Sequence, residues 1–232
     1  MSAIPWLVFL VALIITVNAN TEKLIFLGPS AITIPNVHPG LDDLRLDTLS
    51  PTGQHILETQ LSVEFPTEAE PRGVQSWYLI EGLQEGRRYE LRICWVATQP
   101  TKFWLDVHQI TEVFETPLLV SSLAAYSKRR QDLGLKDPEY TEAYSSTSSK
   151  SALFLQIHSA ADFFSSNRTL MEFPPAVDVD IILDPYLFNI FPRSLGPTAI
   201  YIAILAVGSW FLSGVIHTWL SSIEATPKPH TD

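Results

Sequence analysis

The amino-acid sequence predicts a mainly β fold, a β-sandwich, followed by one transmembrane helix near the carboxyl terminus. Segments that alternate between apolar and polar residues recur between residues 54 and 183, as is typical of half-buried strands. The 17 prolines favour strands, turns and loops over long soluble helices. Residues 194–223 contain no Asp, Glu, Lys or Arg, and residues 197–220 are long enough to cross ~30 Å of hydrocarbon at ~1.5 Å per residue.

Length and composition limit the alternatives. The 232 residues leave room for one domain and little more. Hydrophobic residues make up 46% of the chain and charged residues 17%, so part of the apolar surplus is expected in lipid. The net charge of -10 argues against a nucleic-acid partner, because phosphates would repel the chain.

The amino terminus predicts a secretory signal peptide over residues 1–19. An almost unbroken apolar run covers residues 4–17, and Val17 and Ala19 are suited to the third and first positions before a cleavage site. The first segment lacks the usual Lys or Arg, so an uncleaved anchor helix stays the alternative. Cleavage after Ala19 would start the mature chain in the lumen of the secretory pathway.

The next 50 residues predict short strands separated by turns. Strands are expected at residues 23–26, 31–34 and 54–65, and loops at residues 36–52 and 66–73. The first loop is rich in Pro, Gly and Asp and the second is acidic and bounded by proline, so neither is expected to form a long element.

Residues 77–108 form the centre of the predicted domain. Strict alternation over residues 89–95 places Tyr89, Leu91, Ile93 and Trp95 on one face of a strand. The pattern formed by Leu83, Gly86 and Tyr89 resembles the tyrosine corner of immunoglobulin-like and fibronectin type III sandwiches, in which a Tyr at a strand start bonds upstream backbone. We therefore expect a sandwich of that kind, with these three residues as its structural corner.

A second alternating run, residues 103–107, follows the turn signal at residues 98–101. The two runs together predict a β-hairpin. Residues 110–120 are apolar without a clear period. Residues 124–150 carry the basic triplet Lys128, Arg129 and Arg130 followed by many polar residues, and are expected to form a mobile insertion, or a short helix and a loop. The triplet fits either a solvated loop or contact with lipid phosphates.

The remaining part of the domain predicts two more strands and a modification site. Strands are expected at residues 151–157 and 176–183. Between them, Asn167 opens the sequon Asn-Arg-Thr, which in a lumenal chain marks an exposed loop that carries a glycan. The aromatic residues 184–192 are expected at the boundary between domain and lipid.

The carboxyl-terminal helix predicts permanent anchoring. A GPI-attachment signal is the rival interpretation, but a polar tail follows the span and bulky residues precede it. With a cleaved signal, residues 20–193 form the lumenal domain and residues 221–232 a cytosolic tail.

One face of the span is rich in small residues. These fall within roughly a third of the helix circumference by the ~3.6-residue period: Ala199, Ala203, Ala206, Ser209, Ser213 and His217. Small residues let another helix approach closely, and Ser or His can bond across the gap. The face is either a site for a membrane partner or an incidental feature of a single-pass anchor.

Candidate chemistry is sparse. Cys94 is the only cysteine, which fits a buried structural thiol, with a disulfide to a partner as the alternative. Asp178, Asp180 and Asp184 could suggest a metal site or a glycosyl-transfer motif, but a polar outer strand face explains them more simply. Asp106 and His108 share a face without a third ligand. We therefore assign no catalytic, cofactor-binding or metal-ligating residue and expect no cofactor.

The order of segments and several motifs resemble the fungal co-activator subunit of GPI mannosyltransferase II. The order is a signal peptide, a β-rich domain, one span and a short tail. The motifs are Glu81-Gly82-Leu83, Gly86, Tyr89-Glu90-Leu91-Arg92-Ile93-Cys94-Trp95, Ala97-Thr98, Pro100-Thr101 and Asp184-Pro185-Tyr186.

The resemblance implies a non-catalytic accessory subunit in the endoplasmic reticulum membrane, with its domain in the lumen and its carboxyl terminus in the cytosol. Its partner would be a polytopic mannosyltransferase that adds the second mannose to the GPI precursor, with contact to the lipid-linked glycan left open. Two other functions are retained: a single-pass lumenal adaptor or chaperone-complex subunit for client proteins, and an enzyme acting on glycans through Asp178 and Asp180.

Overall fold

The computed structural model describes residues 20–33, 41–132 and 149–224. The chain divides into two compact units, residues 1–185 and 186–232. The predicted signal peptide and most of the predicted cytosolic tail lie outside the described residues, as does the greater part of the predicted insertion.

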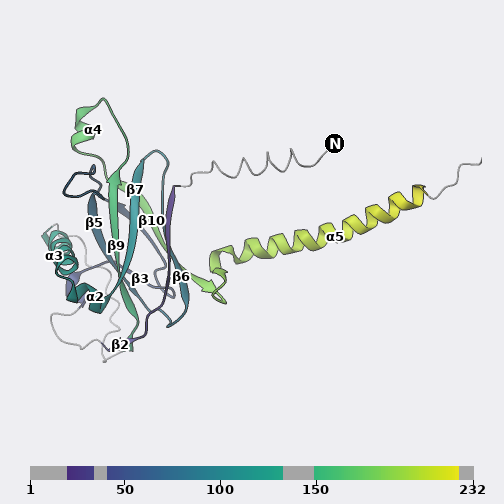
Figure 1. Ribbon diagram of the computed structural model, residues 1–232, viewed down its shortest axis with the longest axis horizontal. Helices are drawn as coiled ribbons and strands as arrows, with labels where there is room; N and C mark the ends of the chain where they lie inside the picture. The colour runs from purple at the N-terminus through teal and green to yellow at the C-terminus, as the bar shows by residue number, and fades with distance from the viewer. Residues whose placement is uncertain (1–19, 34–40, 133–148, 225–232) are drawn as a thin grey trace, which may run out of the picture. The chain divides into compact units, whose positions relative to one another are not determined.

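The first unit, which we call the sandwich domain, contains two β-sheets packed face to face (Figure 1). One sheet has the antiparallel order β1–β6–β10–β4. Its strands are β1 (Thr21–Leu27), β6 (Arg88–Trp95), β10 (Val177–Leu187) and β4 (Ile56–Leu61). We call it the first sheet. The end of β10 belongs to the second unit.

The second sheet has the order β3–β5–β9–β7, with β3 parallel to β5 and the other pairs antiparallel. Its strands are β3 (Thr48–Leu49), β5 (Val74–Glu81), β9 (Ala152–Ala161) and β7 (Thr101–Gln109). Short elements complete the unit: β2 (Ile32–Thr33) pairs with β8 (Ser149–Lys150), and a 3₁₀ helix spans Leu41–Leu44. The β-sandwich prediction is confirmed, whereas the finer assignment to an immunoglobulin-like or fibronectin type III arrangement stays a prediction.

The main core lies between the two sheets. The alternation in β6 buries Tyr89, Leu91 and Ile93 completely, and that in β9 buries Leu155 and Ile157 from the opposite side. Since each face contributes every second residue, the period-two pattern read from the sequence accounts for this core.

The predicted hairpin is wrong. β6 pairs with β1 and β10 in the first sheet, whereas β7 pairs with β9 in the second. The chain therefore crosses from one sheet to the other between Trp95 and Thr101, and the rings of Trp95 and Phe103 meet edge to face at 4.8 Å. Both runs have an inward apolar face because they face each other across the core, not because they are hydrogen-bonded neighbours.

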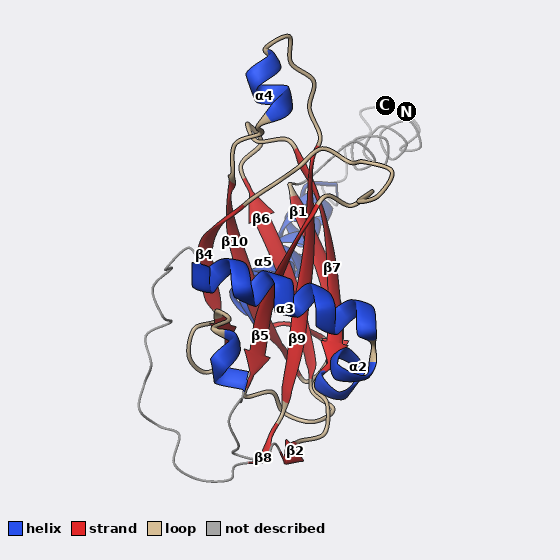
Figure 2. Ribbon diagram, turned by 90° about the vertical axis from the view of Figure 1, so that its left-hand side faces the viewer, coloured by secondary structure: helices blue, strands red, loops and turns tan. Residues whose placement is uncertain are grey.

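Two helices cover the outer face of the second sheet (Figure 2). Helix α2 spans Ile110–Glu115 and helix α3 spans Pro117–Asp132, so residues 124–132 of the expected insertion are the second half of a docked helix. A smaller core lies beneath them and includes Trp77, Phe154 and Leu123. The molecule thus has a third, helical layer.

Hydrogen bonds and an ion pair fix the position of helix α3 on the second sheet. Trp77 Nε1 donates to Ser122 Oγ of α3 at 3.0 Å, and the Ser122 hydroxyl bonds Gln75 Oε1. Near the end of α3, Arg130 donates to both carboxylate oxygens of Asp47, at 2.7 and 2.9 Å. A fork-to-fork pair of this kind fixes orientation as well as distance.

The second unit contains a hairpin and a long helix. The end of β10 pairs with β11 (Phe191–Pro192), and a 3₁₀ turn, Arg193–Leu195, leads into helix α5, Gly196–Glu224. At the hairpin tip Phe188 and Asn189 have positive φ values of 52° and 57°, the left-handed region that a bulky residue such as Phe rarely adopts.

Candidate membrane and partner surfaces

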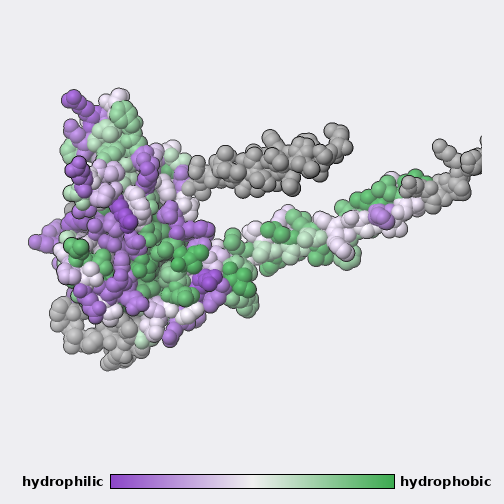
Figure 3. Space-filling view, viewed as in Figure 1, coloured by the Kyte–Doolittle hydropathy of each residue, from purple (hydrophilic) through white to green (hydrophobic). Residues whose placement is uncertain are grey.

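Helix α5 presents a long exposed apolar surface. Among the described residues it is the helix long and apolar enough to cross a membrane, over Arg193–Ile223, and none of its apolar window is buried. Figure 3 shows it coloured largely green and white along the drawn side. At ~1.5 Å per residue it exceeds the ~30 Å of a hydrocarbon core, which leaves polar ends to reach the interfaces.

The six residues predicted as a partner face lie within α5 and are exposed: Ala199, Ala203, Ala206, Ser209, Ser213 and His217. We call this set the small-residue face. Near the helix end, the hydroxyls of Thr218 and Ser221 bond carbonyls one turn back at 2.8 and 2.9 Å. Among the described residues, the Ser213 hydroxyl makes no such hydrogen bond to a carbonyl of its own helix. It can therefore donate to a group on a neighbouring helix.

Two large side chains stand next to the start of α5 in the second unit. Phe188 is 90% exposed and Ile190 is 72% exposed at the β10–β11 hairpin. Aromatic and apolar groups placed at the end of an apolar helix fit the boundary between water and lipid. The expected aromatic boundary segment thus consists of a short hairpin with a strained Phe at its tip.

The residues of the predicted corner lie together at one end of the sandwich domain. The Tyr89 hydroxyl accepts a hydrogen bond from the Gln84 backbone N–H at 2.9 Å, and Leu83 is buried beside it. Gly86 has a φ of 70° and its N–H donates to the Gly28 carbonyl at 3.0 Å. Gly28 has no room for a side chain, because a Cβ there would lie 2.1 Å from the Gln84 carbonyl oxygen. The amino-terminal strand is thereby fixed to the corner.

Tyr89→Phe should therefore lower stability by about 1–2 kcal/mol, since it leaves the partly buried Gln84 N–H without its acceptor. In a protein of this size that corresponds to a melting temperature lower by about 2–8 °C. Thermal unfolding monitored by circular dichroism measures the change. An unaltered melting temperature would mean that water replaces the hydroxyl and that the bond adds nothing.

The outer face of the first sheet carries the acidic residues of the sequence pattern. Asp178 and Asp180 are exposed on β10, and Asp178 Oδ1 accepts from Gln60 Nε2 of β4 at 2.8 Å. They line an open groove of about 520 Å³ together with Glu58 and Trp95. The Asp178 carboxylate is thus hydrogen-bonded to the neighbouring strand, which is typical of a polar outer strand face.

The same face holds an ionic group that sequence analysis missed. Glu90 and Asp184 are 5% and 6% exposed, and both lie near the Arg92 guanidinium, at 3.5 and 3.9 Å. The sequence of a single strand does not reveal the cross-strand neighbours of Glu90, so this ionic group could not be predicted. The register Asp184–Glu90 on adjacent strands brings the two carboxylates to one arginine.

Cys94 also lies on this face and lines the groove. It is half-buried rather than fully buried, and Thr21 Oγ1 approaches its Sγ at 3.6 Å. It is a free thiol in this structure.

The pair Asp106 and His108 does not form a joint site. Asp106 contacts Arg72 at 3.3 Å and the imidazole of His158 at 3.8 Å, whereas His108 bonds Gln156 and Glu112. Burial lowers the pKa of His158, and the nearby Asp106 carboxylate only partly offsets this. Within residues 20–33, 41–132 and 149–224 no group of three His, Cys, Asp or Glu side chains could hold a metal ion.

The basic triplet lies in the last turns of α3. Arg130 is engaged by Asp47, and Arg129 lies over the ring of Tyr126, while Lys128 is exposed. Basic side chains in the last helical turn also favour the carboxyl end of the helix dipole. Arg129 and Arg130 therefore make structural contacts that do not require lipid.

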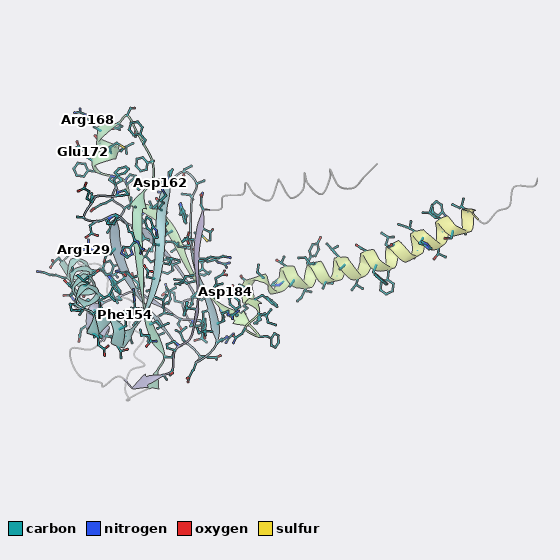
Figure 4. All side chains as sticks on the ribbon, viewed as in Figure 1. Arg129, Phe154, Asp162, Arg168, Glu172 and Asp184 are labelled. Carbon is teal, nitrogen blue, oxygen red and sulfur yellow. The ribbon has the colours of Figure 1, made fainter. Side chains whose placement is uncertain are left out.

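Asn167 is exposed and is the N-cap of helix α4 (Arg168–Glu172), in the loop between β9 and β10. Figure 4 places Arg168 and Glu172 of this helix at the tip of the sandwich domain, beyond Asp162.

Comparison with known families adds the remaining evidence. A family model named Pga1 and described as GPI-mannosyltransferase II co-activator matches residues 9–213, which is most of the chain. No match was found among curated proteins or among solved structures.

Proposed function

Because the chain belongs to the Pga1 family of GPI-mannosyltransferase II co-activators, we propose that it binds the catalytic mannosyltransferase in the endoplasmic reticulum membrane and supports transfer of the second mannose to the GPI precursor. As a co-activator it is a non-catalytic subunit, and the enzyme that it activates is its partner.

The observation that carries this proposal beyond the family is helix α5. An apolar helix of spanning length, with exposed Phe188 and Ile190 beside its first turn, is suited to a single pass whose start lies at the interface. We propose that the sandwich domain faces the lumen and that the carboxyl terminus faces the cytosol. The predicted signal peptide of residues 1–19 supports this orientation.

The small-residue face is the proposed contact with the partner in the membrane. Lipid tails are as apolar as Leu or Ile, so apolarity alone does not drive helix association. Close packing against Ala203 and Ala206, together with hydrogen bonds from Ser213 or His217, would supply the free energy of association between the two helices. Retention in the endoplasmic reticulum would then follow from association with the polytopic enzyme.

Depletion of the protein tests the function directly. We expect lipid-linked GPI intermediates bearing one mannose to accumulate several-fold, measured by mass spectrometry of extracted glycolipids, and to return to normal when the wild-type chain is restored. A normal glycolipid profile after depletion would contradict the proposal.

A matched variant separates the co-activator from an enzyme. Asp178→Ala with Asp180→Ala removes the exposed carboxylates of the acidic groove and should rescue the depleted cells as well as the wild type does. Persistent accumulation with this variant at normal abundance would instead indicate chemistry or glycan binding in the groove.

A further inference from the structure

The loop between β9 and β10 has exposed aromatic side chains that neither the core nor helix α5 explains. Phe164 is 89% exposed and Phe173 is 74% exposed, on either side of α4. Figure 3 shows green, apolar atoms around α4 and the loop beside it. Leu170 of α4 is also exposed, at 38%, so the loop presents several apolar groups to solvent, and such exposure favours a covering group.

The same loop presents the sequon in an accessible form. Asn167 Oδ1 accepts from the Thr169 N–H at 3.0 Å, and the Asn167 N–H bonds Ser165 Oγ at 3.1 Å. Within the described residues Asn167 Nδ2, the atom that would carry a glycan, has no hydrogen-bond partner. Residues 167–169 are all exposed, so a transferase could reach the site in the folded domain.

Phe164 stands three residues before Asn167 on the approach to this turn. The Ser165 N–H bonds Met171 Sδ of α4 at 3.3 Å, which folds the residues after Phe164 back against the helix that Asn167 caps. The first sugar on Asn167 would therefore start close to the ring. Sugars have an apolar face of C–H groups, and an aromatic ring offers the complementary surface.

We infer that Asn167 carries an N-linked glycan whose first N-acetylglucosamine packs over Phe164. The inference rests on the lumenal placement in the proposed function. A lipid-diphosphate-linked oligosaccharide is the donor: the bond between Asn167 Nδ2 and sugar C1 forms while the C1–O bond to the diphosphate breaks. The lipid diphosphate leaves with the electron pair, and the Nδ2 proton passes to a base of the transferase.

The full-length chain expressed in its own secretory pathway tests the modification. Wild-type protein should shift to higher mobility on treatment with endoglycosidase H, and Asn167→Gln should run at that mobility without treatment. As an orientation control, Val96→Asn creates a second sequon, Asn-Ala-Thr, in the exposed turn between β6 and β7 of the same domain.

The two sequons distinguish the possible failures. A shift from the control sequon without one from Asn167 would overturn the inference and leave the lumenal placement intact. A shift from neither would overturn the lumenal placement, and the glycan with it.

Packing on Phe164 needs a separate measurement. In detergent, glycosylated wild type should melt about 2–4 °C above its enzymatically deglycosylated form, as expected for one modest added contact. Phe164→Ala should abolish this difference, whereas Phe173→Ala, which removes another exposed ring beyond α4, should retain it. Equal differences in all three proteins would show that the glycan does not pack on Phe164.

Discussion

Replacing Ala203 and Ser213 together by leucine should reduce the mannosyltransferase that co-purifies with the chain by about tenfold. Both residues lie on the small-residue face of α5, where larger side chains would hold the proposed partner helix away. Overpacking a helix contact costs ~1–3 kcal/mol, and about 1.4 kcal/mol corresponds to tenfold in affinity. The measurement is quantitative pull-down from solubilised membranes, and one-mannose GPI intermediates should accumulate in parallel.

Gly208→Leu is the matched control for this variant. Gly208 lies on the opposite side of α5 at ~100° per residue, and a Cβ there meets nothing within 4 Å. The control adds one leucine side chain to the opposite side of the span and should leave the pull-down unchanged. Equal losses from both variants would show that association does not depend on this face, and normal association of both would place the contact away from the small-residue face.

The strands and the main core could be predicted because the alternation of apolar and polar residues is visible within each strand by itself. Tyr89, Leu91 and Ile93 are fully buried where the alternation placed them. The pairing of strands could not be predicted in this way. Two strands that face each other across a core show the same alternation as two neighbours, so β6 and β7 were assigned to a hairpin although they lie in different sheets.

A short helix within residues 124–150 was one of the two expectations, but the docked helical layer was not predicted, for a different reason. Leu123 and Ser127 are the buried residues of α3, and much of its attachment comes from polar contacts such as Arg130 with Asp47, which is 83 residues away in sequence. The apolar contacts of α3 are limited to a short row, Leu119, Leu123 and Tyr126, which gives a weaker signal than the apolar stripe of a typical amphipathic helix. The buried Glu90 and Asp184 were missed similarly, because only the register of two strands brings them to Arg92.

Trp77→Ala should produce the largest loss of stability in the sandwich domain. Trp77 is fully buried between the second sheet and the helices, packs edge to face on Phe154 at 6.1 Å, and donates from Nε1 to Ser122. Truncation of a buried Trp costs ~3–5 kcal/mol of stability. It also removes the indole N–H that donates to Ser122, which in turn is hydrogen-bonded to Gln75. We expect a melting temperature lower by about 6–20 °C.

Trp104→Ala is the control on the same outer face, because this ring is half-buried and lies under the guanidinium of Arg72. It should cost about 1 kcal/mol or less, in line with an exposed cation–π contact. In cells, a loss of several kcal/mol lowers abundance through quality control, so Trp77→Ala should also raise one-mannose GPI intermediates through reduced protein amount. Equal melting temperatures for the two variants would contradict the assignment of Trp77 as the residue that joins the helical layer to the sandwich.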